Sequence, residues 1–115
     1  NTFVATVQKR GAEIINARGK SSAASAASAI IDTIRSLYTP TREGEWFSLG
    51  VWSEKNPYEI DTNLIFSFPL RSKGDGNWEY VKGLELDGWL LKKLAETQRE
   101  LIEERDQVRG FARLI

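Results

Sequence analysis

The residues best suited to contact a small ligand are the glycine, lysine and serine at positions 19–21. Gly19-Lys20-Ser21 has the residue types that end a phosphate-binding loop, in which a lysine and backbone N–H groups hold phosphate oxygens. The complete motif needs a further glycine five residues earlier, where this chain has Ile14. It also needs a preceding strand, whereas the preceding residues have helical periodicity. We therefore reject a phosphate-binding loop.

A run of serine and alanine follows these residues. Ser21–Ala29 reads SSAASAASA, and it continues without a break into apolar residues at helical spacing, namely Ile30, Ile31, Ile34 and Leu37. The pattern predicts a helix whose first half carries very small side chains, so that another helix or a small ligand can approach closely. Ser21 or Ser22 is a suitable N-cap for this helix. Capping and ligand contact both remain open, because only one of the two serines is needed as the cap.

Two other patterns carry little weight. Gly74 and Gly76 are spaced like the start of a dinucleotide-binding fingerprint, but they lie in a predicted hairpin turn and not between a strand and a helix. Carboxylates are frequent in the last predicted helix, where they face water with no apolar pocket to shift their pKa values. Neither a glycosidase-like carboxylate pair nor a metal–carboxylate site is therefore expected.

The composition excludes several classes of site. The chain has no histidine and no cysteine, so zinc sites, Ser-His-Asp triads, Cys-His dyads and disulfides cannot form within it. Its formal net charge is zero, which does not favour nucleic acid or an anionic membrane as a partner. No stretch approaches the roughly 20 apolar residues of a membrane span, and the N-terminus has no secretory signal pattern. The first residue is Asn1 and not Met, as expected for part of a longer chain or a processed chain.

The surrounding pattern predicts one α+β domain of 115 residues. We expect two N-terminal helices, over 2–18 and from Ser21 to about Tyr38, with Gly19 ending the first. Residues 46–52, 63–70 and 77–81 are predicted strands of an antiparallel meander, with a turn at 73–76. A long C-terminal helix begins after Asp87, its predicted N-cap. Its expected buried stripe is Leu90, Leu91, Leu94, Leu101, Ile102 and Val108, and the tryptophans at 46, 52, 78 and 89 are expected in a core or an interface.

Several segments in this order resemble the C-terminal catalytic domain of the lactate/malate dehydrogenase superfamily, with the cytosolic-type malate dehydrogenases as the most similar group. The most specific segments are RGAEII, ARGKSSAASAA, FSLGV and NPYEIDTNLIFSFP. The resemblance extends over essentially the whole chain and agrees with the helices and strands expected from periodicity. It implies that residues 1–115 form part of the substrate-binding domain, and that the NAD-binding Rossmann domain is absent from this chain.

The resemblance also implies an activity and a site. Members of the family transfer a hydride between NAD and a 2-hydroxy or 2-keto acid, while a histidine moves the hydroxyl proton. The family's catalytic histidine, aspartate and arginines precede the matched region, so no catalytic residue is expected here and the chain alone should be inactive. Gly19, Ser21 and Ser22 match positions that line the substrate, and Ser25 matches one that contacts the nicotinamide. A homodimer and a cytoplasmic location are likewise implied.

Two alternatives remain open at this stage. The chain could come from a lactate dehydrogenase derived within the malate dehydrogenase group, because the residues that set that choice lie in the other half of the protein. It could also be a structural or interaction module that keeps the fold without catalysis, since a fold does not fix a function.

Overall fold

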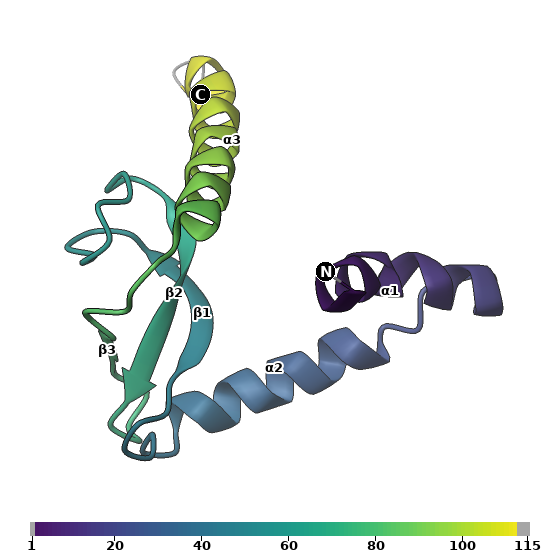
Figure 1. The fold of residues 1–115 in the computed structure, drawn as a ribbon, viewed down its shortest axis with the longest axis horizontal. Helices are drawn as coiled ribbons and strands as arrows, with labels where there is room; N and C mark the ends of the chain where they lie inside the picture. Colours follow the sequence, from purple (N-terminus) through teal and green to yellow (C-terminus); the bar gives the residue numbers. More distant parts are fainter. Residues whose placement is uncertain (1, 113–115) are drawn as a thin grey trace. The chain divides into compact units, whose positions relative to one another are not determined.

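The computed structural model describes residues 2–112 and has the predicted order of helix, helix, three strands and helix (Figure 1). The expected α+β class is confirmed. The chain divides into two compact units, one ending at Arg35 and the other beginning at Ser36, so that the boundary falls in the last turn of the second helix. Among the residues described, no helix combines the length and the apolar character needed to cross a membrane.

The first unit contains α1 (Thr2–Arg18) and most of α2 (Ala24–Leu37). As predicted, Gly19 ends α1: its φ is +79° and its N–H donates to the carbonyl of Ile15 at 2.7 Å, as in a helix C-cap. The start of α2 differs from the prediction. Positions 21–23 are not helical, so that α2 begins at Ala24, one or two residues later than an N-cap at Ser22 or Ser21 would place it.

Neither α1 nor α2 contains a buried residue. Apolar residues recur at helical spacing in both helices, but the larger ones are exposed to water, including Val7, Ile15, Ile30, Ile31 and Ile34. An apolar helix face normally packs against another surface, because this burial supplies most of the stability of a helix in a protein. These faces are therefore available to a surface outside the unit.

The second unit contains the sheet. Strands β1 (Phe47–Trp52), β2 (Ile65–Ser72) and β3 (Trp78–Tyr80) pair antiparallel in the order β1-β2-β3, with β2 in the centre (Figure 1). The predicted meander is confirmed. Strand ends differ from the expected ones by one or two residues, which is the usual uncertainty of such boundaries.

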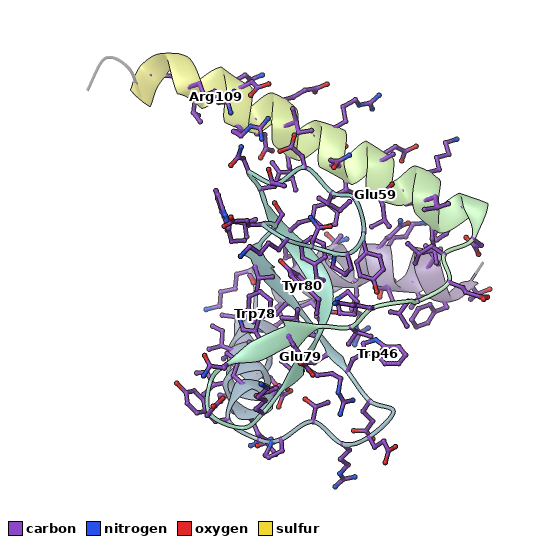
Figure 2. The ribbon with its side chains drawn as sticks, turned by 90° about the vertical axis from the view of Figure 1, so that its left-hand side faces the viewer. Trp46, Glu59, Trp78, Glu79, Tyr80 and Arg109 are labelled. Carbon is purple, nitrogen blue, oxygen red and sulfur yellow. The ribbon has the colours of Figure 1, made fainter. Side chains whose placement is uncertain are left out.

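The core lies on one face of this sheet. Alternate residues of β2 are buried, and Phe68 and Leu70 are only 2% and 0% exposed. Aromatic rings surround Phe68: its ring centroid lies 5.4 Å from that of Phe66 and 5.2 Å from that of Tyr80, which packs edge to face. Tyr80 and Trp78 both come from β3 (Figure 2). The sheet thus has its own hydrophobic centre.

Helix α3 (Gly88–Ala112) joins this core through part of its predicted stripe. Asp87 caps it as predicted, because its Oδ1 accepts a hydrogen bond from the N–H of Leu90 at 2.8 Å. The stripe members that pack against the core are Leu94, Leu101 and Ile102. The prediction is wrong for Leu90, Leu91 and Val108, which are 39%, 53% and 58% exposed.

The tryptophans also differ from expectation. Trp46, Trp52 and Trp89 are about half exposed and do not belong to the core. Trp78 is half-buried and packs against the core cluster. The expectation of a core position is therefore correct for one tryptophan only, and an interface role for the others stays a prediction.

Polar contacts connect α3 to the loop before β2. The N–H of Asp61 donates to Gln98 Oε1 at 2.7 Å, and Arg105 Nη1 lies 2.9 Å from Asp61 Oδ1. The backbone N–H of Asn63 donates to the Asp61 carboxylate and, together with Arg105, lowers the pKa of Asp61 below its usual value. The carboxylate therefore stays ionised to a lower pH in the folded protein.

The same loop is organised by two buried or half-buried polar side chains. Ser53 has no exposed surface, and its Oγ donates to the carbonyl of Asp61 at 2.5 Å and accepts from the N–H of Leu64 at 3.0 Å. Asn56 Nδ2 donates to the carbonyls of Ser53 and Ile60. Buried polar groups need such partners, because an unpaired one costs about 1–3 kcal/mol.

Candidate functional site

The candidate site is the stretch from Gly19 to the first turn of α2. Ser21 and Ser25 are exposed, and Ser22 is half-buried. Ser21 Oγ accepts a hydrogen bond from the N–H of Ala23 at 3.4 Å, and Ser22 Oγ accepts one from the N–H of Ala24 at 3.3 Å. Both distances are long for hydrogen bonds, so the two hydroxyl groups bind their local N–H partners only weakly.

The predicted cap is therefore wrong in position. The residue directly before α2 is Ala23, whose carbonyl accepts the hydrogen bond from the N–H of Ala27 at 3.0 Å. Its φ of +57° is uncommon for alanine and turns the chain into the helix. Each of the two serines bonds an N–H two residues ahead and not the second or third N–H of the helix. Nothing in the sequence marks Ala23 for this conformation, because an alanine rarely adopts it.

The start of α2 has chemical properties that suit an anion. The first N–H groups of a helix lack partners within the helix, and the helix dipole places partial positive charge there. Alanines at 24 and 26 have side chains too small to cover these groups, and Arg18 and Lys20 add positive charge before the helix. Hydroxyl and N–H donors of this kind bind carboxylate or phosphate oxygens.

Gly19 has a conformational role in this stretch. Its φ of +79° lies in the left-handed region, and a Cβ placed there would meet no atom within 4 Å. Its backbone conformation, and not a close approach by another group, requires glycine. The structure thus brings the predicted residues Gly19, Ser21, Ser22 and Ser25 together in one short, accessible segment.

The second unit offers a different kind of cavity. An apolar cavity of about 220 Å³ is lined by side chains such as Tyr58, Ile60, Phe66, Leu84, Leu86 and Leu94. Its lining contains no carboxylate and no cationic side chain, and its polar side chains are those of Tyr58 and Ser67. Within residues 2–112, no cluster of His, Cys, Asp or Glu could hold a metal ion either. The predicted site residues lie instead at the start of α2, where hydroxyl and N–H groups are close to Arg18 and Lys20 in the sequence.

The structure is an α+β domain whose 115 residues include no histidine and no cysteine. Residues 1–112 match the family described as lactate/malate dehydrogenase, alpha/beta C-terminal domain. The chain belongs to this family. The resemblance found in the sequence is thereby confirmed.

Individual relatives agree with this assignment. The chain is 51% identical over 112 residues to a malate dehydrogenase of Protochlamydia amoebophila, covering 97% of this chain and 34% of that protein. It is 52% identical over 103 residues to the chloroplastic NADP malate dehydrogenase of Pisum sativum, covering 90% of this chain and 23% of that protein. The chain thus spans about a third or less of the length of these relatives.

Solved structures of the family have the same fold. The lactate dehydrogenase of Trichomonas vaginalis superposes with a TM-score of 0.87 at 32% identity, over all of this chain and 35% of that one. The malate dehydrogenase of Naegleria fowleri superposes with a TM-score of 0.85 at 36% identity, over 96% of this chain and 33% of that one.

Proposed function

We propose that this chain is the substrate-side part of a malate dehydrogenase that interconverts malate and oxaloacetate. The proposal is supported by identities of about half to malate dehydrogenases across nearly the whole chain. The structural observation that carries it is the accessible start of α2, where hydroxyl and N–H donors face outward beside two cationic residues. A dicarboxylate matches this arrangement in charge and in hydrogen bonding.

In this proposal, each site residue has a specific role. Ser21 and Ser22 donate hydroxyl hydrogen bonds to a substrate carboxylate, while their oxygens can still accept from the N–H groups of Ala23 and Ala24. Gly19 gives the chain the turn that places these serines after α1. A proton acceptor for the substrate hydroxyl must come from outside these 115 residues, since they contain no histidine. We therefore expect the chain alone to be inactive.

The residues present fit only one end of a nicotinamide coenzyme. Ser25 is small, polar and exposed on the first turn of α2, which suits contact with the nicotinamide. The glycines at 74 and 76 do not form a phosphate cradle, because a Cβ at these positions would meet Pro40 and Tyr38. When bound, the coenzyme supplies or accepts the hydride. We propose NAD as this coenzyme, held mainly by a nucleotide-binding domain that is not part of this chain.

The test is a spectrophotometric assay of oxaloacetate reduction. The full-length protein that contains this segment should oxidise NADH, and the 115-residue chain should show no turnover. A preference for NADPH over NADH would change the proposed coenzyme from NAD to NADP, which several relatives use. Turnover by the 115-residue chain alone, or none by the full-length protein with oxaloacetate and pyruvate, would overturn the proposal.

Lactate dehydrogenase is the second candidate, because the Trichomonas vaginalis enzyme shares the fold with a TM-score of 0.87. A related structure of that enzyme is described in complex with NADH and oxamate, a monocarboxylate. Comparing kcat/KM for oxaloacetate and pyruvate in the full-length protein separates the two candidates. We expect oxaloacetate to be preferred, given the identities to malate dehydrogenases.

A homodimer is part of the proposal. It is supported by the exposed apolar face of α2, formed by Ile30, Ile31 and Ile34, and by the small residues of the same helix, which would let a second helix approach closely. Analytical ultracentrifugation of the full-length protein tests it. The cytoplasmic location, and the absence of nucleic-acid and membrane partners, stay predictions.

A further inference from the structure

The sheet unit contains the dipeptide aspartate–glycine twice. Asp75-Gly76 lies in the turn between β2 and β3, and Asp87-Gly88 lies at the start of α3. Aspartate rearranges most readily when glycine follows it, because glycine has no side chain that shields its main-chain nitrogen. The two pairs share this intrinsic reactivity, so a difference between them in the folded protein must come from their surroundings.

The rearrangement passes through a cyclic imide. The main-chain nitrogen of the glycine attacks the carbon of the protonated aspartate carboxyl group, and the N–H proton leaves with the carboxyl hydroxyl as water. A second water molecule then opens the ring at one of its two carbonyls. Opening at the side-chain carbonyl restores aspartate, whereas opening at the main-chain carbonyl gives isoaspartate, in which the main chain runs through the former side chain. The mass is unchanged, and water is the only other reactant.

The turn between β2 and β3 opposes this reaction. The N–H of Gly76 donates to the carbonyl of Leu37 at 3.0 Å, within the same compact unit, so the attacking nitrogen is already engaged. A Cβ on Gly76 would lie 3.2 Å from the ring of Tyr38, so the turn is closely packed. The N–H of Asn77 donates to Asp75 Oδ1 at 3.0 Å and lowers the pKa of Asp75, which makes the reactive protonated form scarcer.

The pair at the start of α3 has different surroundings. Gly88 is exposed, and a Cβ on it would meet no atom within 4 Å. Its N–H is one of the first of the helix, which have no acceptor inside a helix, and no other group in residues 2–112 accepts from it. Trp89 and Leu91 are 54% and 53% exposed, and Leu94 is the first residue of α3 that packs against the core. A first turn of this kind opens at a low cost in free energy.

We propose that Asp87-Gly88 is a site of isoaspartate formation in the folded protein, and that its turn protects Asp75-Gly76 from the same reaction. The product lacks the cap of α3. Asp87 Oδ1 accepts from the N–H of Leu90 at 2.8 Å, and the Asp87 carbonyl accepts from the N–H of Leu91 at 3.0 Å. Isoaspartate adds one methylene to the main chain and moves the carboxylate, so both hydrogen bonds are lost and the first turn of α3 unwinds.

Peptide mapping of the full-length protein, aged at neutral pH, tests the proposal. Trypsin releases residues 74–82 and 83–92 as separate peptides, each with one of the two aspartates and no other. The isoaspartate form of each peptide separates by chromatography at unchanged mass. We expect it to accumulate at least about tenfold faster at Asp87 than at Asp75, because a fraying turn opens far more often than a packed one. In concentrated guanidinium chloride, where the fold is lost, the two rates should be similar.

Two variants change one pair at a time. Gly88→Ala shields the attacking nitrogen with a methyl group for which there is room, and it should slow the reaction at Asp87 severalfold without changing the rate at Asp75. Tyr38→Ala removes the ring beside Gly76, and it should speed the reaction at Asp75 without changing the rate at Asp87.

Three results would overturn the proposal. The first is a rate at Asp75 that equals or exceeds the rate at Asp87 in the folded protein. The second is an unchanged rate at Asp87 in Gly88→Ala. The third is a difference between the two pairs that is as large in guanidinium chloride as in the folded protein, because the fold would then not be its cause. None of these measurements depends on the proposed dehydrogenase function.

Discussion

The helices α1 and α2 and the sheet β1–β3 reach their structures in different ways. In the sheet unit, residues such as Phe68 and Leu70 are almost completely buried. Buried side chains also donate hydrogen bonds to backbone carbonyls outside the strands. Neither helix contains a buried residue, and Ile30 is 60% exposed. Their structure follows from local signals such as Gly19 and the small, helix-favouring alanines.

Because of this difference, we expect the sheet unit to determine the stability of the fold and the helices to provide the contacts with a ligand or partner. The sheet unit has an internal core, so its residues are constrained by packing. The helices present the candidate ligand-binding residues and an apolar face, and both need a surface or molecule from outside to be satisfied. A substitution should therefore have its effect on stability in the sheet unit, and on binding or activity at the start of α2.

The largest contrast should come from the same substitution made in the two regions. Ile60 is 7% exposed in the core, whereas Ile30 is 60% exposed on α2. In the 115-residue chain, Ile60→Ala should lower the free energy of unfolding by about 2–5 kcal/mol because it leaves a cavity. Ile30→Ala should change it by less than about 0.5 kcal/mol, because an exposed site loses little packing. Urea denaturation measures both, and equal losses would contradict the comparison.

Two glycines provide the next contrast. Both Gly74 and Gly19 have positive φ, so that alanine is strained at either position by about 1–2 kcal/mol. Only at Gly74 would the new methyl group also meet Pro40, at 2.7 Å. Gly74→Ala should therefore destabilise the protein by about 1–3 kcal/mol more than Gly19→Ala. Thermal unfolding of the two variants tests this, and a larger loss for Gly19→Ala would contradict it.

Acid should weaken the sheet unit through Asp61. The pKa of Asp61 is lowered in the folded state, by the Asn63 N–H first and then by Arg105. A group with a depressed folded pKa contributes stability above its unfolded pKa, and this contribution disappears as the pH falls through the folded value. Asp61→Asn should therefore flatten the fall in stability below about pH 4. Urea midpoints measured from pH 7 to pH 3 check this, and an unchanged slope would count against it.

The smallest effect on stability is expected at the serine before α2. The contact from Ser22 Oγ to the N–H of Ala24 is 3.3 Å long, so Ser22→Ala should cost less than about 0.5 kcal/mol. If Ser22 binds the substrate carboxylate, the same variant of the full-length protein should lose about tenfold or more in kcat/KM for oxaloacetate. A loss of activity no larger than the change in stability would assign Ser22 to local structure alone.

Much of the fold follows from sequence patterns. Alternating residues gave the buried face of β2, glycines and proline marked the ends of α1 and α2, and Asp87 marked the start of α3. The exposure of the apolar helix faces could not be predicted from such patterns. The stripes of α1, α2 and part of α3 are amphipathic in sequence, but a pattern shows only that a face could be buried, not that a partner surface is present.

The location of the candidate site stays a prediction, and its local geometry differs from expectation at Ala23. The family resemblance selected Gly19, Ser21, Ser22 and Ser25, and the structure places them in one accessible stretch. The turn at Ala23 escaped prediction, because alanine carries no signal for positive φ. The contacts of Ser72 with Leu37 and Thr41 escaped it as well, since they join residues far apart in the sequence.

The hydrogen bonds that Arg71 donates to the loop after α2 have a practical consequence for protein engineering. Among residues 2–112, its guanidinium donates to three backbone carbonyls, those of Thr41, Arg42 and Glu45. Arg71 therefore holds this loop through the loop's backbone carbonyls. The exposed side chains at positions 42, 43 and 45 can be exchanged without removing these hydrogen bonds. A single cysteine introduced at Glu43 would be the only thiol in this cysteine-free chain. It would give a site for attaching a fluorescent or spin label whose backbone is held in place.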